Sequence, residues 1–152
     1  MSLGGGGGQM QQLQEQMQAL EQEKQAIQAE VQNLRGEQGE IDEAIEAIET
    51  LETGSTVQVP VGGDAYVRAE IQDIDEVIVT LGGGYAAERD SDGAIDSLED
   101  KQDALDDRIE ELQGEIEKVE SETADLEAKA QQAQQQQMQQ LQQQMQQQQD
   151  DE

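Results

Sequence analysis

The sequence predicts an α+β fold, in which a long antiparallel coiled-coil helical hairpin carries two β-hairpins between its helices. Three observations predict it. Apolar residues recur at alternating steps of three and four near both ends of the 152-residue chain, which is the pattern of a coiled-coil seam. In the middle they alternate with polar or small residues, as in half-buried strands. The two seams also match each other in antiparallel order.

The N-terminal coiled-coil helix is expected over residues 9–52, after a flexible Gly-rich N-terminus over residues 1–8. Most positions outside its seam are Gln or Glu, which favour helix and solvent. Lys24 and Gln38 are polar exceptions within the seam. The expected seam residues are Met10, Leu13, Met17, Leu20, Lys24, Ile27, Val31, Leu34, Gln38, Ile41, Ile45 and Ile48.

Residues 54–88 are expected to form two β-hairpins with glycine turns at Gly62-Gly63-Asp64 and Gly82-Gly83-Gly84. Pro60 cannot donate to a ladder, so its strand should be an edge strand or be bulged there. Isolated two-stranded hairpins are at best marginally stable in water. We therefore expect their apolar residues to be buried in an assembly of subunits. The expected oligomerisation residues are Val57, Val59, Val61, Val67, Ile71, Val77, Val79 and Leu81.

The C-terminal coiled-coil helix is expected over residues 90–133, followed by a Gln-rich tip and acidic tail over residues 134–152. One antiparallel register satisfies both seams, with Ile48 opposite Ile95 and Ile27 opposite Ile116. The alternative is a parallel dimer through each helix separately. The expected seam residues are Ile95, Leu98, Gln102, Leu105, Ile109, Leu112, Ile116, Val119, Thr123, Leu126, Ala130 and Ala133.

The helix, two hairpins and second helix resemble the prefoldin family, and most of all its archaeal alpha subunits. Three segments carry the resemblance: Glu49-Thr50-Leu51-Glu52, the stretch from Val59 to Val67, and the stretch from Glu76 to Ala86. The resemblance implies a hexamer of two alpha and four beta-type subunits whose strands form a barrel-like platform. It also implies an ATP-independent holdase chaperone, which binds unfolded proteins at the coiled-coil tips and delivers them to a group II chaperonin. The alternative function is a structural coiled-coil adaptor that bridges specific folded partners.

The expected tip is almost free of charge. Residues 1–20 contain one charged side chain, Glu15, and residues 130–149 contain none. Met10 and Leu13 face Ala133 and Ala130 of the opposite seam, and Met17 faces Leu126, so the tip core is underfilled. The last three apolar residues lie one position off the seam. Methionine-rich surfaces can re-pack against varied partners. The predicted client-binding residues are Met10, Leu13, Met17, Met138, Leu141 and Met145.

Two alternative interpretations of these residues involve no client binding. The first three could serve seam packing alone, and the last three could be scattered residues of a disordered Gln-rich tail.

Composition excludes several functions. The chain has 36 acidic and 8 basic residues, a net charge of −28, and no Cys or His. A phosphate backbone would be repelled, so nucleic acid is not expected as a partner. No thiol nucleophile or usual zinc site is available, and no apolar run approaches the roughly 18 residues of a membrane span. We expect a cytoplasmic protein that is not an enzyme and has no cofactor, metal or membrane partner.

The acidity itself favours a halophilic protein. At about 1 M salt the Debye length falls to roughly 3 Å, so repulsion within the chain is largely screened. A basic partner surface is the alternative explanation.

Two motifs imitate ligand sites. Gly82-Gly83-Gly84-Tyr85-Ala86-Ala87 fits a dinucleotide-binding pattern, but a structural glycine turn is favoured. Residues 88–99 resemble an EF-hand loop, and cation binding there remains open. The favoured interpretation is a helix start capped by Asp90, Ser91 or Asp92, since such residues satisfy free backbone N–H groups.

Overall fold

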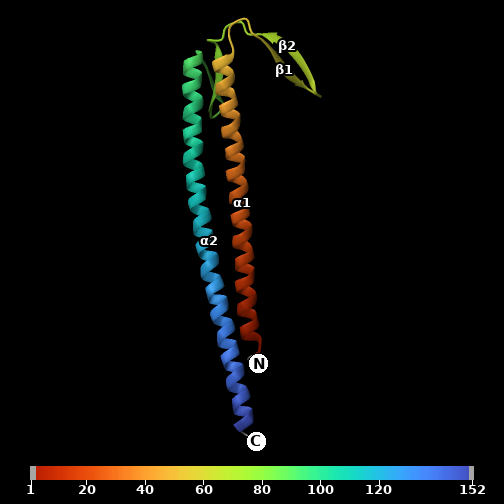
Figure 1. The fold of residues 1–152 in the computed structure, drawn as a ribbon, viewed down its shortest axis with the longest axis vertical. Helices are drawn as coiled ribbons and strands as arrows, with labels where there is room; N and C mark the ends of the chain where they lie inside the picture. Colours follow the sequence, from red (N-terminus) through yellow and green to blue (C-terminus); the bar gives the residue numbers. More distant parts are fainter. Residues whose placement is uncertain (1–2, 151–152) are drawn as a thin grey trace. The chain divides into compact units, whose positions relative to one another are not determined.

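The computed structural model describes residues 3–150 and the side chains of residues 8–149. Two long helices, one before and one after two small antiparallel sheets in chain order, make up the structure (Figure 1), so the predicted α+β fold is confirmed. In chain order the elements are α1 (Leu3–Thr50), β1 (Thr56–Gly62), β2 (Ala65–Glu70), β3 (Val77–Gly82), β4 (Tyr85–Arg89) and α2 (Ser91–Asp150).

The helices exceed the expected segments. Helix α1 begins at Leu3 rather than residue 9, and α2 continues to Asp150 rather than ending at residue 133. Glutamine is a good helix former, and no Gly or Pro follows Gly114, so nothing ends α2 earlier. The expected flexibility of residues 1–8 stays a prediction. Residues 1, 2, 151 and 152 lie outside the described part of the chain.

The chain divides into two compact units. We call residues up to Val31 together with those from Glu110 the terminal unit, and residues 32–109 the central unit. In each unit α1 and α2 run antiparallel within a single chain, as predicted. Every predicted seam position is buried or half-buried, and between residues 8 and 50 the sole addition is Ala44.

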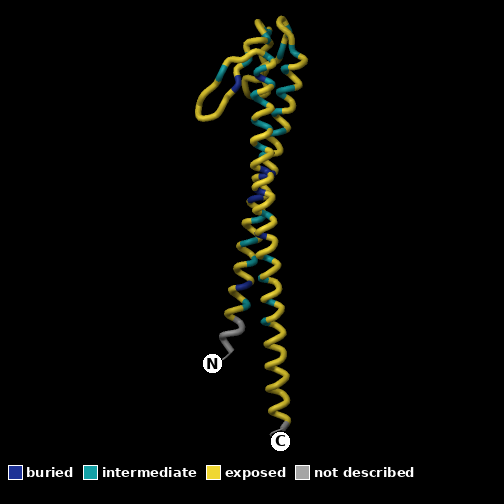
Figure 2. Tube along the Cα trace, turned by 90° about the vertical axis from the view of Figure 1, so that its left-hand side faces the viewer, coloured by how far each residue is buried: buried dark blue, intermediate teal, exposed yellow. Residues whose placement is uncertain are grey.

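The terminal unit is a two-helix seam. Its buried side chains are Leu13, Ile27 and Val31 of α1, and Leu112 and Val119 of α2. They appear as dark blue segments separated by exposed positions in Figure 2, which is the spacing expected of a coiled coil.

Lys24 is tolerated in this seam because its charged end leaves it. The Lys24 Nζ lies 3.1 Å from Glu120 Oε1. Glu120 directly follows Val119, the residue that the expected register places opposite Lys24. A lysine stem can pack along apolar surface while its ammonium stays near water.

The central unit contains a polar layer that fixes the helix register. The Gln38 side-chain amide donates to the backbone carbonyl of Gln102 at 3.5 Å, and the Gln102 amide donates to that of Gln38 at 3.4 Å. Gln38 Nε2 also donates to Asp106 Oδ1 at 2.5 Å, and Gln102 Nε2 donates to Asp42 Oδ1. The polar exceptions of the two seams are therefore partners, and a polar pair in an apolar seam specifies register.

The β-hairpins form two separate two-stranded sheets, β1–β2 and β3–β4. Gly63 and Asp64 have φ values of 57° and 60°, and Gly83 and Gly84 have values of 61° and 81°. Positive φ at both central residues is typical of a type I′ turn. The β1–β2 pairing shifts between Pro60 and Gly62, so the predicted bulge near Pro60 is confirmed.

Helix α2 starts at a side-chain cap. The Asp90 carboxylate accepts a hydrogen bond from the Gly93 N–H at 2.8 Å, so the predicted cap is confirmed for Asp90. A Cβ at Gly93 would lie 2.7 Å from that carboxylate oxygen, and glycine keeps this cap compact. The segment from Ser91 to Glu99 is therefore helix rather than an EF-hand loop.

Candidate functional site

The most exposed apolar surface of the terminal unit is near the end of α2. Met138, Leu141 and Met145 are 66%, 56% and 66% exposed. Their spacing of three and four residues places them on one helix face, and we call this set the tail stripe. Every residue from 134 to 149 is exposed (Figure 2). No part of the described chain covers the stripe.

The N-terminal candidates lie differently. Leu13 is 9% exposed and belongs to the core of the seam, while Met10 and Met17 are half-buried. The alanines opposite therefore do not leave Leu13 open to solvent. Of the six predicted client-binding residues, the three in the tail stripe offer the largest accessible surface. None of the six has a demonstrated contact, so their role stays a prediction.

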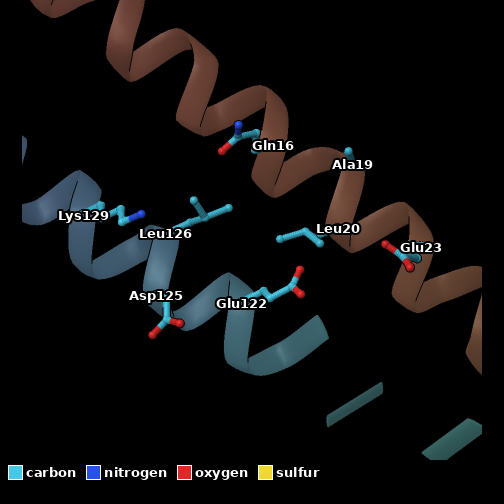
Figure 3. A pocket seen from close by; sticks show the side chains of 8 residues that line it. All are labelled: Gln16, Ala19, Leu20, Glu23, Glu122, Asp125, Leu126 and Lys129. Atoms are coloured by element: carbon cyan, nitrogen blue, oxygen red, sulfur yellow. The ribbon is translucent and has the colours of Figure 1, made fainter. Parts of the chain in front are cut away.

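A groove of about 430 Å³ lies between α1 and α2 in the terminal unit. Figure 3 shows Leu20 and Leu126 pointing toward each other from the two helices, with charged side chains around them. Its lining residues are Gln16, Ala19, Leu20, Glu23, Glu122, Asp125, Leu126 and Lys129. An apolar floor with a charged rim suits an amphipathic segment. The heptad pattern predicts both leucines as seam residues, in neighbouring layers, but does not predict a hollow between them.

The predicted oligomerisation residues fall into three burial classes. Val79 is buried; Val57, Ile71 and Val77 are half-buried; Val59, Val61, Val67 and Leu81 are 41–60% exposed. Val59 pairs with Val67 across β1 and β2, so these two valines contribute to one apolar sheet face. Assembly through this face stays a prediction.

The alternation pattern did not predict three exposed side chains of the hairpins. Tyr66, Ile78 and Tyr85 are 60%, 75% and 76% exposed. Tyr66 pairs with Pro60, and Ile78 pairs with Glu88. Strand alternation puts Ile78 on the face opposite Val77 and Val79, so β3 presents apolar side chains on both faces. The sequence signal that could have predicted their exposure was the presence of adjacent apolar residues in a strand, not alternation.

Leu81 also has a second environment within the central unit. With Thr80 and Gly82 it lines a groove of about 580 Å³ beside α1 and α2. Ile41, Leu98 and Leu105 contribute apolar side chains to the same groove. The end of β3 therefore lies against the helices.

The part of the chain that the structure describes does not show the geometry of a metal or dinucleotide site. Across that part, no three acidic side chains are grouped so that they could hold a metal ion. Gly82 to Gly84 belong to the turn region joining β3 to β4, so they do not open a helix as a dinucleotide site requires. None of the described helices is long and apolar enough to cross a membrane.

Two long helices joined through two β-hairpins, with exposed apolar surfaces in both units, define a class of coiled-coil proteins. The Prefoldin family model, described as "Prefoldin subunit", matches residues 20–136. This match covers most of the sequence, and the chain belongs to the prefoldin family. The resemblance read from the sequence is confirmed.

Curated relatives carry the description "Prefoldin subunit alpha". One from Halobacterium salinarum is 64% identical over 103 residues, which cover 67% of each chain. One from Natronomonas pharaonis is 77% identical over 50 residues, or 33% of each chain. One from Haloarcula marismortui is 62% identical over 95 residues, or 62% of each. These organisms are halophiles, in keeping with the acidic composition.

Solved structures are similar as well. A cryo-EM structure of filamentous PFD from Methanocaldococcus jannaschii superposes with a TM-score of 0.52 at 27% identity, covering 79% of this chain and 96% of that one. The crystal structure of the prefoldin beta subunit from Thermococcus strain KS-1 gives a TM-score of 0.55 at 22% identity, covering 82% and 91%. The second similarity concerns the fold alone.

Proposed function

We propose that this chain is a subunit of an ATP-independent holdase that binds unfolded proteins through its coiled-coil tip. The exposed, uncharged tail stripe is the observation that carries this proposal. Unfolded chains expose apolar side chains in no fixed arrangement, and flexible methionines can adapt to them. Residues 130–149 carry no charge, so they would not select clients by the sign of the client's charge. Met10 and Met17 would add half-buried surface next to the seam.

The hairpins would supply the assembly surface. Their exposed valines and unpaired strand edges are typical of strands that pair with other chains. The prefoldin family membership supports a hexamer of two alpha and four beta-type subunits, in which the strands of all subunits form a barrel-like platform. Clients would then pass to a group II chaperonin in the cytoplasm.

The direct test replaces the three residues of the tail stripe with glutamine in the full-length chain, as M138Q/L141Q/M145Q. We expect the assembled chaperone to lose most of its suppression of aggregation for two unrelated denatured clients. Glutamine is a good helix former, so helicity measured by circular dichroism should stay unchanged.

The matched control is Q136A/Q143A/Q147A, which alters the opposite face of the same helix and should retain suppression. Full activity of the stripe variant, with an intact assembly, would remove the tail stripe from the mechanism. Strong binding of one folded partner without suppression of either client would instead favour an adaptor.

A further inference from the structure

The sequence of the tail stripe occurs twice in the chain. Residues 137–146 read QMQQLQQQMQ, and residues 9–18 read QMQQLQEQMQ. Nine of the ten positions are identical, and the exception is Gln143, which corresponds to Glu15. The first copy lies in α1, where Leu13 is buried and Met10 and Met17 are half-buried against α2. The same side chains at the same spacing are therefore able to form a two-helix seam.

The second copy has no helix beside it in the described structure, and its three apolar residues are more than half exposed. Charge indicates what could cover it. Two copies of a chain with a net charge of −28 repel each other over most of their length, but residues 130–149 are neutral. Residues 130–149 are the longest uncharged stretch of the chain, although acidic residues follow from Asp150, so a second copy can approach this segment with little repulsion between like charges.

We propose that residues 137–146 of two copies of this chain pair side by side as a short coiled coil through Met138, Leu141 and Met145. The spacing of the stripe favours a parallel, in-register pair. Each apolar residue then meets its own counterpart, giving three consecutive apolar layers. An antiparallel pair forms layers from unlike heptad positions, so one methionine of each chain would lie opposite a glutamine.

Pairing covers the same side chains that the proposed function gives to clients. If that function holds, the paired tails withhold the stripe until a client competes for it. This consequence rests on the proposed function, whereas the pairing itself does not and is measured without any client.

The test uses single cysteines in the full-length chain, which has none of its own. The variants Met138→Cys, Leu141→Cys and Met145→Cys each place one thiol in the stripe, and Gln143→Cys places one on the opposite helix face. After mild oxidation in molar salt, disulfide-linked dimer is quantified on a denaturing gel. We expect about tenfold more dimer from each stripe variant than from the control, because pairing raises the effective concentration of the two thiols.

Three outcomes would overturn the proposal. Equal dimer from the stripe variants and the control would mean random collision or crowding within the assembly. Linkage between mixed Met138→Cys and Leu141→Cys chains, without linkage of Met138→Cys to itself, would indicate antiparallel pairing. No dimer from any stripe variant whose helicity is intact would leave the tails unpaired. Loss of client protection in M138Q/L141Q/M145Q bears on the proposed function and not on this result.

Discussion

Residues 9–18 and 137–146 are nearly the same decapeptide in two environments. In α1 the central leucine, Leu13, is 9% exposed, whereas its counterpart in α2, Leu141, is 56% exposed. Both segments are helical, so local propensity does not separate them. The difference is the presence of a partner helix, so the same stripe becomes buried core or exposed surface according to what lies beside it.

Lowering the salt concentration should have the largest effect, because it acts on the charged part of the chain and not on the neutral tail. Below a few tenths molar salt, screening weakens and repulsion among the 36 acidic residues grows. We expect the seam, or the assembly, to be lost on dialysis to low salt, as measured by circular dichroism and sedimentation. Unchanged helicity and mass at low salt would contradict a requirement for molar salt.

A core substitution should distinguish seam from stripe. Leu112 is 1% exposed, so Leu112→Ala should lower the free energy of unfolding by about 3 kcal/mol through lost burial and a residual cavity. Leu141→Ala, its control on the same helix, should change it by about 0.5 kcal/mol or less at protein concentrations too low for the tails to pair. Thermal unfolding in molar salt measures both. Equal losses would mean that Leu141 is covered in the protein as it exists in solution.

The smallest effect is expected from a substitution that makes the two decapeptides identical. Gln143→Glu converts residues 137–146 into an exact copy of residues 9–18. The unfolding free energy should change by about 0.5 kcal/mol or less, because the position is exposed. Residue 143 lies on the helix face opposite the tail stripe, so disulfide formation by Leu141→Cys should also change little, at low salt as at high salt. The variant Gln143→Ala is the uncharged control.

Much of the fold could be predicted because its elements obey local rules. The seam follows from the heptad spacing, and the two polar exceptions, Gln38 and Gln102, prove to be partners. Consecutive glycines before each turn predict hairpins, since type I′ turns need positive φ. The cap at Asp90 follows from the side-chain chemistry of helix starts.

Features that depend on long-range packing could not be predicted. Heptad spacing says nothing of how closely the helices approach, so the burial of Leu13 opposite alanines was unexpected. Leu81 lines a groove with residues that are distant in the sequence, such as Ile41 and Leu105. No short sequence pattern predicts this arrangement. The position of the candidate site could be predicted, because the spacing of the tail stripe can be recognised in the sequence. The exposure of the stripe could not be predicted, because it depends on whether another helix lies beside it.

The reciprocal amide contact between Gln38 and Gln102 has a consequence for folding. A hairpin that closed one heptad out of step would place Gln38 beside Leu98 or Leu112, and Gln102 beside Leu34 or Ile48. The Gln38 and Gln102 amides would then lose Asp106 and Asp42 as acceptors, and a hydrogen bond of this kind contributes about 1 kcal/mol. Most of the remaining layers are aliphatic and can replace one another, so this contact, together with the ion pair of Lys24 and Glu120, discriminates against misaligned arms.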